Sequence, residues 1–228
     1  MGMAAAMLGI VVVAIALHSF GLPAERITSP ADQLGVFIGV GGNLGSLFAA
    51  LFGAMAITGE VRYGTIRPTL LATPQRGRVM AAKSLVALVA GVGFGVLATA
   101  LGAAAGTLFL GLRGVSVDVS AGDYALLVAG GAAAASLWSV IGLGVGSIVR
   151  SQVPTVVGIF VWVLFVENVL ITSIPSVGKF SPGALGRALA GGTEGTLQTP
   201  ALGLGLLVVY AGAVFVAGWL ATTRRDFT

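Results

Sequence analysis

Six long stretches with few or no charged residues dominate this sequence. They cover about residues 3–17, 33–58, 84–112, 124–149, 153–172 and 200–222. A helix crosses the hydrocarbon core of a bilayer with about 20 apolar residues. Only 9% of the chain is charged, whereas a soluble domain carries about 25%. The sequence therefore predicts an all-α polytopic membrane protein: one domain over residues 1–228 with six transmembrane helices.

Other spanning structures fit these stretches poorly. A transmembrane β-barrel is built from short segments of alternating polarity, and these stretches are long and continuously apolar. The first stretch is the shortest, and a cleaved signal peptide is its alternative interpretation. It has no positive charge ahead of it and no clear small-residue cleavage site after residues 18–20. We therefore expect a retained helix there.

The basic residues predict the orientation, because cytoplasmic loops of membrane proteins are enriched in Lys and Arg. If the loop after the second span and both chain ends are cytoplasmic, eight basic residues lie on that side: Arg62, Arg67, Arg76, Arg78, Lys83, Arg150, Arg224 and Arg225. Four lie on the other side: Arg26, Arg113, Lys179 and Arg187. The net charge of +4 is therefore explained by topology, without nucleic-acid binding. The chain has no cysteine and one histidine, which excludes disulfides, thiolate metal sites and a histidine metal cage.

The densest polar run, residues 58–83, follows the second span. Gly64 can end the helix that leaves the membrane, and Thr65 can cap a new one. The Thr73-Pro74 pair would end this second helix, which we expect over about residues 66–72. A short helix under the membrane suits docking of a partner. The alternative is an ordinary basic loop that only determines topology.

The order and spacing of residues in this run resemble the loop of type-2 ATP-binding-cassette exporter permeases. The matching residues are Glu60, Arg62, Gly64, Thr65, Arg67, Leu70, Pro74, Arg76 and Lys83. The resemblance implies that the loop forms a coupling helix, which seats in a groove of a separate cytoplasmic ATPase. It assigns Glu60, Arg62, Gly64, Thr65, Arg67, Leu70, Pro74 and Arg76 to ATPase coupling. Pro68 departs from the family's usual pattern, and so does the absence of a charged amphipathic stretch before residue 3.

The resemblance also implies the function and the partners. The expected protein is the permease subunit of an ATP-driven exporter in the plasma membrane of a bacterial cell, working with an ATPase and a second permease copy. We expect no catalysis and no bound cofactor in this chain, because ATP and magnesium are used by the ATPase. Residues 77–84 nearly match a phosphate-binding loop, but Ala82 replaces the required glycine and the run leads into a membrane span. The alternatives are an ion-coupled secondary transporter and, less favoured, an interfacial membrane enzyme.

Glu167 is an acidic residue inside the fifth span. An unpaired charge at the bilayer centre costs about 2.5–3.5 kcal/mol on insertion scales, so Glu167 should face protein or water and find a donor. It can contact a polar or cationic substrate or relay protons. The alternative is protonation, or pairing with Lys179 or Arg187 of the outer loop.

The second span is the most polar, with Asn43 and Ser46 among its glycines. Together with Glu167, these residues are our candidates for the substrate path. Glycine pairs spaced by four residues let helix backbones approach closely. They are Gly35/Gly39, Gly41/Gly45, Gly91/Gly95, Gly102/Gly106 and Gly142/Gly146.

The outer loop over residues 173–199 predicts one more helix. Ser181 can cap it and Pro182 can occupy its first turn. We expect this helix over about residues 182–190, lying at the membrane surface as an interfacial or re-entrant segment. A simple structured loop is the alternative.

Overall fold

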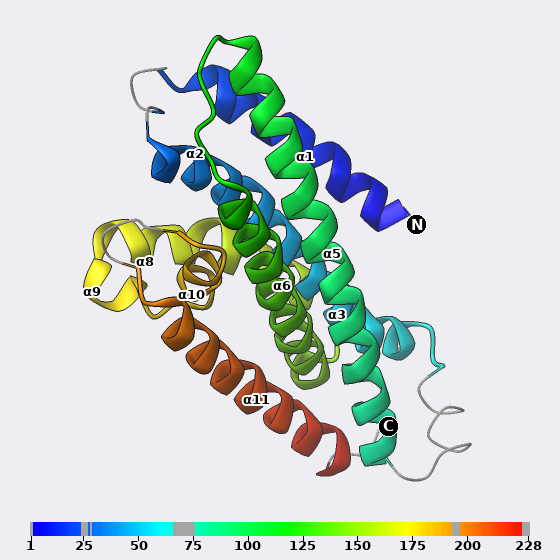
Figure 1. Cartoon of the computed structure of the whole chain (residues 1–228). Helices are drawn as coiled ribbons and strands as arrows, with labels where there is room; N and C mark the ends of the chain where they lie inside the picture. The colour runs from blue at the N-terminus through cyan, green and yellow to red at the C-terminus, as the bar shows by residue number, and fades with distance from the viewer. Residues whose placement is uncertain (1, 24–26, 28, 66–75, 193–196, 225–228) are drawn as a thin grey trace.

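The computed structural model describes residues 2–23, 27, 29–65, 76–192 and 197–224. These residues form a helical bundle (Figure 1). The helices, in chain order, are α1 (Gly2–Gly21), α2 (Pro30–Phe37), the π-helical turn η2 (Ile38–Gly42), α3 (Asn43–Arg62), α5 (Arg76–Leu112), α6 (Ala121–Val149), α7 (Gln152–Val161), the π-helical turn η3 (Trp162–Val166), α8 (Glu167–Ser173), α9 (Pro175–Gly178), α10 (Pro182–Leu189) and α11 (Pro200–Arg224).

Six of these helical segments are long and apolar enough to cross a membrane. They are Gly2–Gly21, Pro30–Arg62, Gly77–Leu112, Ala121–Val149, Gln152–Ser173 and Pro200–Thr222. Each contains or nearly coincides with one predicted stretch, and the described part of the chain contains no strand. The predicted all-α architecture with six spans is therefore confirmed.

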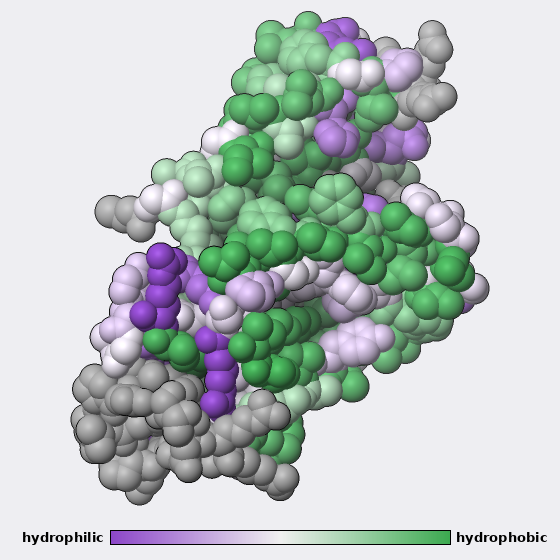
Figure 2. Space-filling view, turned by 180° about the vertical axis from the view of Figure 1, so that it is seen from behind, coloured by the Kyte–Doolittle hydropathy of each residue, from purple (hydrophilic) through white to green (hydrophobic). Residues whose placement is uncertain are grey.

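Helix α6 lies at the centre of the bundle, in contact with α3, α5 and α11 (Figure 1). The second span, which includes α3, is the most enclosed: 76% of its apolar window is buried, against 22% for the first, fifth and sixth spans. Apolar residues cover most of the surface between two polar ends (Figure 2). This distribution is expected of a protein whose middle faces hydrocarbon.

Glycine makes the central contacts possible. A Cβ at Gly142 of α6 would overlap the carbonyl oxygen of Ala50 on α3, and a Cβ at Gly53 would overlap that of Ser139. A Cβ at Gly95 of α5 would lie 2.6 Å from the Cα of Ala132. The predicted close packing is confirmed at these helices. Gly35 differs, since a Cβ there would meet nothing within 4 Å.

Polar side chains cap the first residues of the second and fourth spans. Ser29 and Asp32 form a capping box at the start of α2, and Ser120 and Asp123 form another at the start of α6. Each box satisfies backbone amides that a helix start leaves without partners. Gly64 follows α3 with φ +70°, so it ends that helix as predicted. The predicted coupling helix, residues 66–72, lies outside the described residues.

The short helix of the outer loop is present and packs against other helices of the bundle. Ser181 caps α10 and Pro182 is its first residue, as predicted. However, Leu185 is fully buried and Leu189 is 7% exposed, in one core with Trp138 of α6 and Leu207 of α11. A Cβ at Gly130 of α6 would overlap the Leu189 carbonyl, so glycine lets α10 pack into the bundle. A helix that lies free of the bundle is therefore excluded, and a re-entrant segment stays a prediction.

In Figure 1, the start of α5 and the last turns of α11 lie at the same end of the bundle, and a Cβ at Gly77 of α5 would lie 3.3 Å from Trp219 Nε1 of α11. An even number of spans requires this arrangement. The assignment of that side to the cytoplasm remains a prediction from the basic residues.

Candidate functional site

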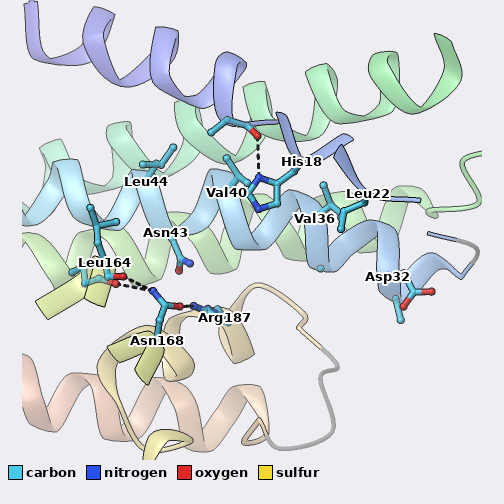
Figure 3. Close-up of a pocket in the computed structure, with 14 residues that line it drawn as sticks. His18, Leu22, Asp32, Val36, Val40, Asn43, Leu44, Leu164, Asn168 and Arg187 are labelled. Atoms are coloured by element: carbon cyan, nitrogen blue, oxygen red, sulfur yellow. Dashed lines mark hydrogen bonds between the residues drawn. The ribbon is translucent and has the colours of Figure 1, made fainter. Parts of the chain in front are cut away.

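A cavity of about 690 Å³ opens between α1, the second span, the fifth span and α10 (Figure 3). Its apolar wall comes mainly from Leu22, Val36, Val40, Leu44, Val163 and Leu164. Its polar lining is His18, Asp32, Asn43, Asn168 and Arg187. The volume lies within the range of about 300–1,000 Å³ that is usual for small-molecule pockets. We call it the large cavity.

A second, much smaller cavity lies deeper, between α3, α6, α8 and α10. It is lined by Ile38, Gly42, Asn43, Ser46, Gly131, Ala134, Trp138, Val163, Glu167, Gly183, Gly186 and Arg187. Its free volume of about 10 Å³ is close to the space that one water molecule needs. Asn43 and Arg187 line both cavities. The structure thus brings together the three predicted path residues, Asn43, Ser46 and Glu167, around this small cavity.

Two π-helical turns shape these cavities. Ile38 and Gly42 of η2 line the small cavity, and Val163 of η3 lines both. In η3 the Glu167 amide donates to the Trp162 carbonyl five residues earlier. Such turns occur frequently at functional sites. The sequence analysis did not predict them, because both segments are as apolar as ordinary helix.

Glu167 is 2% exposed and holds the start of α10. The Gly183 amide donates to its Oε1, and the carboxyl group also interacts with the Ser181 hydroxyl. Amides at a helix start favour a negative partner. The expectation that Glu167 faces protein and finds a donor was therefore correct. Within the described chain, no salt bridge joins it to Lys179 or Arg187, although Arg187 interacts electrostatically with it and lines the same small cavity. The pairing alternative stays a prediction.

Asn168 and Arg187 connect the fifth span to α10. The Asn168 Nδ2 donates to the carbonyls of Val163 and Leu164, at 3.3 and 3.0 Å. Arg187 Nη2 donates to Asn168 Oδ1 at 3.2 Å. These bonds orient Asn168 toward Arg187 (Figure 3). Sequence reasoning treated Arg187 only as a partner of Glu167 and gave Asn168 no role, because their meeting depends on the buried position of α10.

Two buried nitrogen atoms beside the cavities have no hydrogen-bond partner in the described structure. They are Arg187 Nε and Trp138 Nε1. A buried donor without an acceptor is costly, so their positions mark places where a water or a ligand atom would be stabilising. Among the described residues, no three His, Asp or Glu side chains gather as a metal site requires.

An ion pair joins α3 and α5, the two helices that flank the polar loop, which is the middle of the polar run over residues 58–83. Lys83 Nζ of α5 donates to Glu60 Oε1 of α3 at 2.6 Å and to the Ala56 carbonyl at 3.0 Å. The two side chains are only 18% and 28% exposed. Arg62 Nη1 donates to Gln152 Oε1 of α7 at 3.0 Å. The base of the loop is therefore attached to the third and fifth spans.

The remaining residues predicted for coupling are placed unevenly by the structure. Thr65 is exposed, and its hydroxyl donates to the Glu60 carbonyl at 3.5 Å. Arg67, Leu70 and Pro74 lie outside the described residues. Arg76 is the first residue of α5, and its side chain is not described.

Comparison with known proteins adds no relative to this picture. No protein-family model and no curated protein matches the sequence. The function is therefore argued from the residues themselves.

Removal of the Glu167 carboxyl group tests its role at α10. We expect Glu167→Leu to lower the free energy of unfolding by about 2–3 kcal/mol, because the buried Gly183 amide loses its acceptor. Glu167→Gln keeps an acceptor and should cost about half as much. Thermal unfolding of the purified chain in detergent measures both.

Asp118→Asn is the matched control, because Asp118 is an exposed acid outside the core. It should change stability by less than about 0.5 kcal/mol. Equal midpoints for Glu167→Leu and Asp118→Asn would contradict the anchoring role.

Proposed function

We propose that this chain is the membrane-spanning permease subunit of an ATP-binding-cassette exporter, driven by a separate cytoplasmic ATPase. The observation that carries the proposal is the ion pair between Glu60 and Lys83 at the base of the polar loop. It joins α5, which follows the loop, to α3, which precedes the loop and is the helix most enclosed by the bundle. A force applied to the loop would therefore reach the interior of the protein.

A transporter also requires a space for its cargo, and the large cavity supplies it. It is bordered by the second and fifth spans, and Arg62 links the cytoplasmic end of the second span to α7 of the fifth. Closure of two ATPase subunits would push on the loop and shift these spans between inward- and outward-facing states. Such a shift moves cargo when the two states contact it differently.

A proton-coupled carrier is less well supported. It would need Glu167 to exchange protons with a transport path. In the structure Glu167 is almost fully buried and bonded to the start of α10, which favours an anchoring role.

Single cysteines test the orientation, since the natural chain contains none. Tyr63 is 75% exposed beside the polar loop, and Ser116 is exposed at the opposite end of α5. In intact cells we expect a membrane-impermeant maleimide to label Ser116→Cys within minutes. Tyr63→Cys should react only after permeabilisation. The reverse pattern would invert the topology and exclude coupling to a cytoplasmic ATPase.

The same two variants test the partner. A benzophenone maleimide attached at Tyr63→Cys should, on illumination, cross-link the chain to a protein that is also labelled by a photoreactive ATP analogue. The probe at Ser116→Cys is the matched control and should capture no such protein. The proposal is wrong if no ATP-binding protein is captured from position 63, or if both positions capture it equally.

A further inference from the structure

Arg187 gives the large cavity a positive group inside a largely apolar wall. Its neutral partner Asn168 occupies one of its five donors, and its Nε is buried without a partner in the described structure. Glu167 interacts with Arg187 electrostatically across the small cavity, but its Oε1 accepts from the Gly183 amide and no salt bridge joins the two in the described structure. A guanidinium with free donors in weakly polar surroundings binds an anion more strongly than it does in water.

The side-chain amide of Asn43 adds hydrogen-bond donors beside Arg187. The Asn43 side chain lines both cavities next to Arg187, and it has no hydrogen-bond partner among the described residues. Its NH₂ group can donate to an oxygen that Arg187 also binds. Arg187 and Asn43 together thus offer donors from two elements, α10 and α3.

Asp32 is the other charged residue in the described lining, and it attracts a cation less strongly than Arg187 attracts an anion. Asp32 lies at the far end of the cavity from Arg187 (Figure 3). It is exposed, and its Oδ2 already accepts from the amide and the hydroxyl of Ser29, at 3.1 and 2.6 Å. It therefore serves the start of α2, where a negative charge is stabilised by the helix.

Apolar residues line the large cavity between its Arg187 end and its Asp32 end. Leu22, Val36, Val40, Leu44 and Leu164 face this space. Hydrocarbon placed there would bury apolar surface at about 25 cal/mol per Å². We propose that the large cavity binds an amphipathic anion, with its carboxylate or phosphate on Arg187 and Asn43 and its apolar part along this wall. That this molecule is the exported cargo rests on the proposed function; the binding itself does not.

Direct binding to the purified full chain tests the inference without the ATPase. The probe is 11-(dansylamino)undecanoic acid, and the chain is held in nanodiscs of phosphatidylcholine. We expect saturable fluorescence enhancement with the acid. The methyl ester of the same probe, which has no charge, should bind at least tenfold more weakly. Equal binding of acid and ester, or tighter binding of a dansyl-alkylamine, would overturn the proposal.

Two variants locate the bound probe. Arg187→Ala should weaken binding of the acid by about ten- to hundredfold, the usual loss for hydrogen bonds to a charged group. Gly35→Leu should abolish binding by filling the cavity, because a side chain at Gly35 meets no atom within 4 Å and folding should be unaffected. Gly93→Leu is the matched control, since Gly93 is equally free of neighbours on α5 and does not line the cavity. Unchanged affinity in Gly35→Leu would place the probe elsewhere and refute the site.

Lipid composition separates the two sources of an anionic head. If phosphatidylglycerol added to the nanodiscs displaces the probe at equal lipid content, the amphipathic anion of the cavity is a membrane lipid. If the probe stays bound, the anion comes from a source other than the bilayer. Both outcomes support the anion site. Failure of probe binding alongside successful ATPase capture from Tyr63→Cys would reject the cargo class and leave the proposed function standing.

Discussion

Replacement of Gly142 by alanine is expected to lower the free energy of unfolding by about 3 kcal/mol. The new methyl group would overlap the Ala50 carbonyl oxygen. Backbone cannot move aside as a flexible side chain can, so α3 and α6 must separate along their length. This contact joins the central helix to the most enclosed span, and its loss should therefore loosen the whole bundle.

The measurement is the midpoint of thermal unfolding in detergent, followed by the fraction that remains monodisperse after heating. A loss of this size corresponds to a fall of about 6–12 °C for a chain of this length. Gly212→Ala is the matched control, because Gly212 lies within α11 with no atom within 4 Å of its would-be Cβ. It should be neutral or stabilising by up to about 1 kcal/mol. Similar midpoints for the two variants would show that the close contact between α3 and α6 does not limit stability.

The second large effect is expected from Lys83→Met. The substitution removes the cation that joins α5 to α3 through Glu60 and the Ala56 carbonyl. Under the proposed function, the ATPase would then push on a loop whose two flanking helices, α3 and α5, no longer move together. We expect ATP-driven movement of the spans to be lost while the protein still inserts and binds its partner.

Gly35→Cys reports that movement without a known cargo, because the position is open and lines the large cavity. In the complex with its ATPase, the rate of maleimide labelling at this cysteine should change severalfold when ATP is added. In the Lys83→Met background the rate should be the same with and without ATP. Lys179→Met is the control, since Lys179 is a lysine beyond the fifth span that stacks over Phe180 at 5.2 Å. ATP-dependent labelling that persists in Lys83→Met would refute transmission through the ion pair.

Much of the fold could be predicted from the sequence because the membrane imposes one strong rule. Backbone groups in hydrocarbon must bond internally, so a long apolar stretch has little choice but helix. Gly64 and Ser181 were correctly expected at helix ends for another local reason: glycine adopts a positive φ, and a serine hydroxyl accepts from amides at a helix start. These are local properties of the chain.

The features that were not predicted depend on contacts between distant parts of the chain. The close packing of α10 depends on Gly130, whose missing Cβ leaves room for the carbonyl of Leu189, 59 residues later. Short helices with one charged residue are also common at surfaces. The contact of Arg187 with Asn168 follows from that packing. The small residues Gly183 and Gly186 of α10 were a signal that could have indicated close packing.

The π-helical turn η3 allows the fifth span to lose one residue without losing its contacts to α10. Each residue of an α-helix turns the chain by about 100°, and a π turn accommodates one residue more than an α turn. Deletion of one residue from Trp162–Val166 would therefore convert η3 into an α turn and leave Glu167 and Asn168 facing α10. Deletion of one residue from a span without a π turn, such as α6, would instead rotate everything after it by that angle. The length of the fifth span is therefore less constrained at η3 than the length of the central helix.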